Sequence, residues 1–294
     1  MSIDTVWLVG AGYWGSKISN TLMGMGIKAK VIDVKNGNSI EDINDNNPVI
    51  LATPLWDHYE QAKQILSNGN DLYVEKPMAE TAAQCRHLKE LSNDQILMVG
   101  HIFLYHPLVT RLKELIDCNE IGRIRYIESN RLNWGIYQTK TSALLSLAPH
   151  DISIIQYLLG GQPMEVNAIG TGVNNPDQFD HITAFLDYDE GIEVKLNLSW
   201  FYPEKIRKMV IIGDKGSLIY DDVSSTITVN NGYLEGTRLI EADNYVLHNE
   251  SKVSPLKLEL KHFIDCCNNR TVPISDVNNS IEVMETLDRL HHTL

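Results

Sequence analysis

The chain has 294 residues, of which 43% are hydrophobic and 21% are charged, and its formal net charge is −13. The length and composition suit two globular domains, and the acidic balance argues against nucleic acid or an anionic membrane surface as the main partner. No apolar run approaches the roughly 18 residues that a membrane span needs, and the first residues carry no basic leader, so we expect a cytoplasmic protein.

Short apolar strands alternate with helices over the first hundred residues. Strands are expected at 5–12, 28–34, 48–54, 71–77 and 95–103, and helices at 16–26, 57–69 and 79–93. Such alternation is typical of a parallel sheet with helices on both faces. We therefore predict an α/β fold that begins with a nucleotide-binding domain over residues 1–103.

The pattern changes after residue 103. A helix at 106–122 is followed by longer strand-like runs between turn signals, at 123–134, 164–173, 180–189, 191–202, 208–222 and 225–236. The tail returns to helix at 255–270 and 278–292. We predict that residues 104–294 form an α+β domain with an open, mostly antiparallel sheet, whose C-terminal helices are able to pack back on the first domain.

The stretch VGAGYWGSK places Gly10, Gly12 and Gly15 in a GxGxxG pattern directly after a strand and at the start of a helix. This pattern indicates a Rossmann dinucleotide site, in which the diphosphate lies on the helix N-terminus. Asp33, at the end of the next strand, would accept hydrogen bonds from the adenosine ribose and repel a 2′-phosphate. The sequence therefore favours NAD over NADP.

Two further segments, ATPLWDH (52–58) and VEKP (74–77), end predicted parallel strands, where ligands bind in open α/β sheets. Lys76 could hydrogen-bond a substrate hydroxyl beside a nicotinamide, or it could form an ordinary surface ion pair. The predicted cofactor-binding residues are Gly10, Gly12, Tyr13, Trp14, Gly15, Asp33, Thr53, Pro54, Trp56, His58, Glu75 and Lys76.

The stretch PHDISIIQYLLGG contains a histidine that could act as a base. His150 follows Pro149 and is expected in the first turn of a helix, where the N-terminus disfavours imidazolium and favours the neutral base. The alternative is a histidine that only caps or packs the helix. Asp151 is interpreted as a first-turn carboxylate with a structural role.

Taken together, these motifs resemble the Gfo/Idh/MocA family of sugar and cyclitol oxidoreductases. The resemblance includes GAGYWG, ATPLWDHYEQA, EKP, VGHIFLYHP, EIGRIRYIESNRLN and PHDISIIQYLLGG, and it covers nearly the whole chain. It implies an N-terminal Rossmann domain that binds NAD(P) and a C-terminal sheet that often joins subunits, here into a homodimer or homotetramer. It also implies a catalytic pair of Lys76 and His150, and it is greatest for the branch that acts on nucleotide-linked sugars, such as UDP-N-acetylhexosamine or hexosaminuronate 3-dehydrogenases.

Two departures from the family pattern stand out. Many members carry an aspartate four residues before the histidine, whereas this chain has Ser146, which is no acid or base near neutral pH. Only 15 residues separate Asp33 from Val49, where the family usually fits a helix, a strand and a further helix. We predict that the Rossmann sheet is shortened after its second strand.

The predicted substrate-binding residues are Tyr105, Arg131, Asn133, Ser146, His150 and Lys205. Lys205 and Arg207 could hold a substrate phosphate or be charges at a strand edge, and Trp134 and Trp200 could stack on a sugar or only pack. The four cysteines, Cys85, Cys118, Cys266 and Cys267, show no CxxC spacing, so we expect free thiols and no metal.

These observations predict an NAD-dependent dehydrogenase that oxidises a ring hydroxyl of a sugar, nucleotide-linked in the preferred interpretation. One alternative is a dehydrogenase of a free sugar, a cyclitol or a small cyclic alcohol. Another is a nucleotide-binding relative without activity, because Ser146 replaces the usual aspartate. A reductase of a non-sugar substrate would be expected to lack the EKP and PHD motifs.

Overall fold

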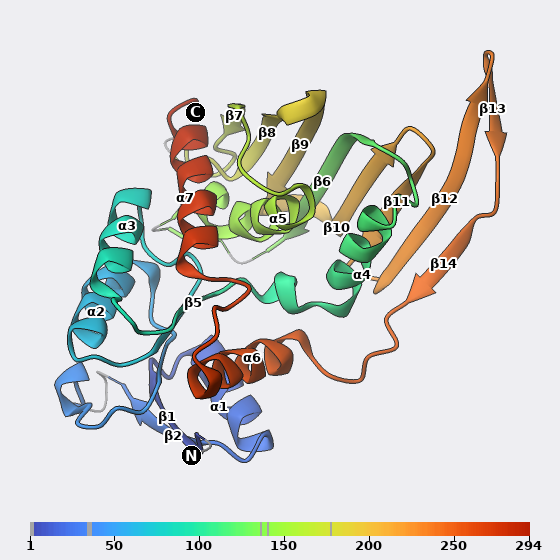
Figure 1. The fold of residues 1–294 in the computed structure, drawn as a ribbon. Helices are drawn as coiled ribbons and strands as arrows, with labels where there is room; N and C mark the ends of the chain where they lie inside the picture. The colour runs from blue at the N-terminus through green and yellow to red at the C-terminus, as the bar shows by residue number, and fades with distance from the viewer. Residues whose placement is uncertain (1–2, 34–36, 136, 140, 177) are drawn as a thin grey trace. The chain divides into compact units, whose positions relative to one another are not determined.

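A computed structural model describes residues 3–33, 37–135, 137–139, 141–176 and 178–294. Contacts divide the chain into two compact units (Figure 1). Residues 1–105 and 253–285 form the first unit, and residues 106–252 and 286–294 form the second. The domain boundary after residue 103 stays a prediction.

The first unit contains a five-stranded parallel sheet in the order β2-β1-β3-β4-β5. Its strands are β1 (Thr5–Val9), β2 (Lys28–Ile32), β3 (Val49–Leu51), β4 (Leu72–Glu75) and β5 (Leu97–Gly100). Every residue of β3 and β5 is buried, as expected for strands covered on both faces. The predicted parallel sheet is confirmed.

Helices in pairs cover the parallel sheet. Helix α1 (Tyr13–Gly24) packs beside α6 (Pro255–Asn269), and α2 (Leu55–Ser67) packs beside α3 (Ala82–Leu91). The strand expected at 95–103 ends at Gly100, and the chain continues as the 3-10 helix η3 (Ile102–Tyr105), which contacts α6. Residues from both ends of the sequence therefore build the first unit.

Strand β2 forms one edge of the first sheet. Among the described residues between β2 and β3, the structure has one short 3-10 helix, η2 (Ile40–Asp42), and no strand. The shortening predicted after the second strand is thus confirmed. Asp45 ties this short connection to the sheet, because its carboxylate accepts hydrogen bonds from Trp7 Nε1 at 2.8 Å and Lys30 Nζ at 2.7 Å.

The second unit contains a nine-stranded sheet in the order β13-β12-β11-β10-β6-β9-β8-β7, with β14 also paired to β12. Its strands are β6 (Ile124–Trp134), β7 (Glu165–Thr171), β8 (His181–Tyr188), β9 (Ile192–Ser199), β10 (Phe201–Gly213), β11 (Gly216–Asp221), β12 (Thr226–Glu235), β13 (Arg238–Glu241) and β14 (Tyr245–His248). The pair β6–β9 is parallel and the other pairs are antiparallel, which confirms the predicted mostly antiparallel sheet.

Helices lie against one face of the second sheet (Figure 1). Helix α4 (Pro107–Asp117) contacts β11 and β12, and α5 (Ala143–Leu159) contacts β6, β8 and β9. The 3-10 helix η4 (Asp189–Gly191) joins β8 to β9, and α7 (Val277–His291) runs from residues of the first unit into residues of the second. Within the described residues, no helix is both long and apolar enough to cross a membrane.

We expect Asp45→Asn to destabilise the protein at pH 7 by on the order of 1 kcal/mol, because the amide loses its charge-assisted bond to Lys30. Burial raises the pKa of Asp45, but the bonds from Lys30, Trp7 and Asn47 outweigh it and lower the pKa to about 2. A carboxyl group whose pKa is lower in the folded state than in the unfolded state stabilises the fold at pH values above the unfolded-state pKa. This stabilisation is lost as the pH falls through the folded-state pKa.

Thermal unfolding of the Asp45→Asn variant and the unchanged protein at pH 7 and at pH 3 measures this effect. The difference in melting temperature should shrink at the lower pH. An equal difference at both pH values would show that the Asp45 charge does not stabilise this connection.

Candidate cofactor and active site

The turn from β1 to α1 is shaped by glycines. A Cβ atom built on Gly10 would lie 2.7 Å from the Ala52 carbonyl oxygen, and one built on Gly15 would lie 2.0 Å from the Gly10 carbonyl oxygen. Gly10 also has a φ of +99°, which disfavours any L side chain. Glycine at these two positions thus has a steric basis, because α1 begins against the end of β1 only when both positions lack a side chain.

Gly12 is the N-cap of α1 and offers no side chain to the first-turn N–H groups. A Cβ atom at Gly12 would meet nothing within 4 Å, so open space lies above the helix end. Backbone N–H groups and the helix dipole at such an end bind anions. The turn therefore fits the diphosphate of a dinucleotide.

A groove of about 390 Å³ lies at this end of the sheet. Its lining residues are Val9, Gly10, Ala11, Gly12, Tyr13, Trp14, Ile32, Asp33, Ala52, Thr53, Pro54, Asp57 and Gln61. Seven of the predicted cofactor residues are among them, with Asp33 directly after β2. Gln61 was missed by the sequence analysis; its side-chain oxygen accepts a hydrogen bond of 2.6 Å from Thr53 Oγ1.

The segment that carries Lys76 is supported by Glu75, the last residue of β4. Trp14 Nε1 donates a hydrogen bond to Glu75 Oε1, and Tyr73 Oη donates to the same oxygen at 3.0 Å. A Cβ atom on Gly100, which pairs with Glu75 in the sheet, would lie 2.5 Å from Tyr73 Oη. The Trp14 bond joins the start of α1 to the residue before Lys76.

Glu259 of α6 is a second acid in this region, with none of its surface exposed. Burial raises the pKa of Glu75 to about 6, although the bonds from Trp14 and Tyr73 oppose the rise. Burial, followed by the negative charge of Glu75, raises the pKa of Glu259 well above its usual range. Two buried carboxylates in one region do not both ionise easily, so Glu259 favours its protonated form.

Two predicted cofactor residues on α2 have different surroundings. Trp56 is 49% exposed, as an aromatic residue available to a ligand would be. His58 is 2% exposed and does not line the groove; its ring nitrogens lie 2.8 Å from the carbonyl oxygens of Pro77 and Thr53. The structure therefore places His58 against the backbone of the segments 52–58 and 74–77.

In the second unit, the predicted position of His150 within its helix is wrong. Helix α5 begins at the N-cap Ser142, whose Oγ accepts a hydrogen bond from the Leu145 N–H at 3.4 Å, and Pro149 lies inside the helix. His150 is therefore in the middle of α5. A proline is favoured in a first turn, which made Pro149 resemble a helix start. The effect of a helix N-terminus that was expected at His150 therefore does not apply.

Asp151 forms a buried ion pair with Arg131 of β6. Arg131 Nε lies 2.5 Å from Asp151 Oδ2 and Nη2 lies 3.2 Å from Oδ1, while Ser129 Oγ donates to Oδ1 at 2.8 Å. Arg131 is 5% exposed and Asp151 is 3% exposed. Burial opposes the charge on Arg131, but the Asp151 carboxylate raises the arginine pKa. The first-turn position expected for Asp151 is wrong, because α5 begins at Ala143 and Asp151 lies in the middle of the helix.

The remaining predicted substrate residues lie in several places. Ser146 is one turn before His150 on α5 and accepts a hydrogen bond of 3.4 Å from Gln138 Nε2. Asn133 follows Arg131 on the same side of β6, and Lys205 is exposed on β10. Tyr105 belongs to the first unit, where its buried hydroxyl lies 2.9 Å from Ser275 Oγ. The roles of all predicted site residues stay predictions.

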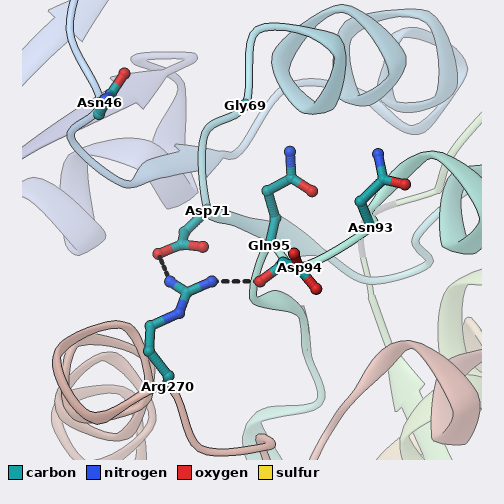
Figure 2. Close-up of a pocket in the computed structure, with 7 residues that line it drawn as sticks. All are labelled: Asn46, Gly69, Asp71, Asn93, Asp94, Gln95 and Arg270. Atoms are coloured by element: carbon teal, nitrogen blue, oxygen red, sulfur yellow. Dashed lines mark hydrogen bonds and ion pairs between the residues drawn. The ribbon is translucent and has the colours of Figure 1, made fainter.

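A polar hollow of about 380 Å³ lies at the other end of the parallel strands (Figure 2). Arg270, in the left-handed conformation at the end of α6, contacts Asp71 at 2.6 Å and the Asp94 carbonyl. Asp71 precedes β4 and Asp94 lies shortly before β5, so this arginine fixes α6 at the amino ends of the strands.

Among the described residues, no group of three or more His, Cys, Asp or Glu side chains is arranged to hold a metal ion.

Family models match both parts of the chain. The model described as "Oxidoreductase family, NAD-binding Rossmann fold" matches residues 28–103, and that of the GFO/IDH/MocA C-terminal domain matches residues 109–219. Together they match well over half of the chain.

Two proteins with named activities are similar to this chain in sequence. The 2,7-anhydro-N-acetylneuraminate hydratase of Mediterraneibacter gnavus is 26% identical over 76% of this chain and 69% of its own length. The scyllo-inositol 2-dehydrogenase (NAD(+)) of Bacillus subtilis is 26% identical over 80% of this chain and 72% of its own length.

A solved structure shares the fold. The UDP-N-acetylglucosamine 3-dehydrogenase of Acidithiobacillus ferrooxidans superimposes with a TM-score of 0.84 over 100% of this chain and 98% of that chain, at 19% identity. In sequence, that protein is 24% identical over 62% of this chain and 57% of its own length.

We expect Asp151→Asn to lower the free energy of unfolding by about 3–5 kcal/mol, because the buried Arg131 guanidinium loses its counter-charge. The double variant Arg131→Met with Asp151→Leu should recover most of this loss, since both charges are then removed. Urea unfolding measures the three free energies.

The control is Asp265→Asn in the exposed Lys261–Asp265 pair of α6, which should leave stability nearly unchanged. A double variant as unstable as Asp151→Asn alone would refute charge pairing as the source of the loss.

Proposed function

The chain belongs to the Gfo/Idh/MocA oxidoreductase family and binds NAD through its Rossmann fold, and we propose that it is a dehydrogenase of a sugar hydroxyl. In this proposal a hydride passes between a ring secondary alcohol, carried by a nucleotide-linked sugar, and the nicotinamide. The observation that carries it is the groove in which the glycine turn, the open end of α1 and Asp33 meet, with Lys76 on the segment joined to it through Glu75 and Trp14.

The chain's own residues divide the work in this proposal. The bound NAD supplies the hydride acceptor. Lys76 polarises the substrate oxygen, and His150 accepts the hydroxyl proton, so that proton removal accompanies hydride departure. The backbone N–H groups of the first turn of α1 hold the diphosphate, and Asp33 accepts hydrogen bonds from the ribose hydroxyls.

Ser146 limits what α5 contributes to proton transfer. It lies one turn before His150, so its hydroxyl is on the same helix side and could orient a substrate oxygen or the imidazole. A hydroxyl carries no proton to or from substrate at neutral pH. Lys76 and His150 therefore perform the proton work in this proposal, and a relative without activity is the alternative that a complete loss of turnover would support.

The substrate class is proposed from charge and from the named relatives. Lys205 is exposed on β10, and Arg207 contacts Asp222 at 3.3 Å, so Lys205 is the better candidate for a substrate phosphate. The relative that acts on UDP-N-acetylglucosamine favours a nucleotide-linked sugar. The inositol dehydrogenase relative supports the second candidate, a free cyclitol or sugar.

We further propose that two copies associate through the open face of the second sheet. The strand registers place Ile169, Phe185 and Ile212 on one face of that sheet, and these side chains are 67%, 43% and 42% exposed. They share this face with charged residues such as Lys195 and Glu128, and an interface between two copies would bury the exposed apolar side chains. We also propose a cytoplasmic location, because four free cysteines suit a reducing compartment.

We expect Lys76→Met and His150→Gln each to lower kcat by roughly 10²- to 10⁴-fold with UDP-N-acetylhexosamines and NAD, because each removes a proton-transfer group. NAD affinity should change far less than kcat, because in this proposal α1 and Asp33 hold most of the dinucleotide. The measurement is NADH absorbance in the kinetic assay and calorimetric NAD titration.

The control is Lys261→Met, an exposed lysine on α6, which should keep full turnover. Turnover with free inositols but not with UDP-sugars would support the second candidate, and unaltered turnover in Lys76→Met would refute the proposed mechanism.

We expect NAD to bind more tightly than NADP, because the Asp33 carboxylate repels a 2′-phosphate. Asp33→Ala should narrow this preference by weakening NAD binding and relieving the repulsion of NADP. Calorimetric titration of both dinucleotides against both proteins measures it. A preference for NADP in the unchanged protein would contradict the assigned role of Asp33.

A further inference from the structure

His58 joins two strand-end segments of the first unit. It lies in the first turn of α2, and its side chain is buried among residues of that unit, with 2% of its surface exposed. Its Nδ1 lies 2.8 Å from the Pro77 carbonyl oxygen, and its Nε2 lies 2.8 Å from the Thr53 carbonyl oxygen. One imidazole ring thus bridges the segment after β3 and the segment after β4.

The two bridged segments have different places in the site. Thr53 lines the cofactor groove, and its hydroxyl is already bonded to Gln61. Pro77 directly follows Lys76, so a hydrogen bond to the Pro77 carbonyl holds the backbone that carries the lysine side chain. His58 therefore touches the cofactor side of the site with one nitrogen and the Lys76 side with the other.

A neutral imidazole has one N–H group and donates one hydrogen bond. Burial lowers the pKa of His58, against the opposing effect of the two carbonyl contacts, so the neutral ring prevails near pH 7. The contact with Pro77 is buried, whereas the contact with Thr53 is only partly buried. An unsatisfied buried carbonyl costs more than one that water reaches, so the proton is best placed on Nδ1.

We propose that His58 is a positioning residue that sets the place of Lys76 by donating a hydrogen bond from Nδ1 to the Pro77 carbonyl. This inference rests on the proposed function, because it takes Lys76 to act on the substrate hydroxyl. The residue touches neither substrate nor cofactor in this role. It acts on Lys76 through Pro77, the next residue in the chain.

Two amide variants separate the two ring nitrogens. The side-chain amide of His58→Asn replaces Nδ1 and can still donate to Pro77, whereas that of His58→Gln replaces Nε2 and reaches Thr53. We expect His58→Asn to keep kcat within about threefold, and His58→Gln and His58→Leu to lower kcat roughly 10- to 100-fold, as a misplacement of about 1 Å does. The KM for NAD should change little in His58→Asn and His58→Gln.

Hydrogen exchange of the protein without substrate gives a second readout. Peptides covering residues 74–80 should exchange faster in His58→Gln and His58→Leu than in His58→Asn or the unchanged protein. The control is His87→Asn on α3, a half-buried histidine bonded to Tyr59, which should leave kcat and this exchange unchanged.

Equal kcat and equal exchange in His58→Asn and His58→Gln would overturn the inference, as would unaltered kcat in His58→Leu. Lys76→Met, measured in the same assay, tests the proposed function separately from the role of His58. If that variant retains turnover, the proposed function fails, and hydrogen exchange still decides whether His58 holds the segment. If it is inactive while the His58 variants behave alike, only the role of His58 fails.

Discussion

The groove at the carboxyl ends of the parallel strands depends on a close backbone approach at the turn from β1 to α1. A Cβ atom at Gly15 would lie 2.0 Å from the Gly10 carbonyl oxygen, so any other residue there would push the helix away from the strand. Because the helix starts so close, the side chain of Trp14 in its first turn reaches Glu75 at the end of β4. The same turn that leaves N–H groups for a diphosphate therefore also ties the Lys76 segment in place.

The first unit contains buried carboxyl groups, and burial disfavours their ionised forms. Glu75 and Glu259 are acids whose pKa values burial raises, and Tyr73 donates to Glu75 in the space that Gly100 leaves. Buried acids of this kind often reduce stability, and apolar residues of similar volume would serve packing as well. Glu75 directly precedes Lys76, so the bonds that Trp14 and Tyr73 donate to Glu75 hold the backbone of that segment. Helix α6, from the end of the chain, completes this support.

Patterns of neighbouring residues in the sequence predict most of the fold. The alternating strands and helices and the short connection after Asp33 are patterns of neighbouring residues, and each predicted its feature correctly. The glycine spacing predicted a cofactor site at a turn that lines a groove in the structure, and the binding role of these glycines stays a prediction. The position of His150 was wrong because Pro149 resembles a helix start, while the N-cap Ser142 lies outside that motif. The ion pair of Arg131 with Asp151 was missed, since nothing in the spacing of a strand residue and a helix residue indicates that they touch.

The assignment of Lys76 and His150 to one hydroxyl is tested most directly by a crystal structure with NAD bound. The diphosphate should lie on the first turn of α1, the ribose hydroxyls should contact Asp33, and Lys76 and His150 should both face nicotinamide C4. In the same crystals with substrate added, the reacting ring carbon should lie about 3–3.5 Å from C4. A dinucleotide bound outside the groove, or a His150 ring turned away from the nicotinamide, would contradict the assignment.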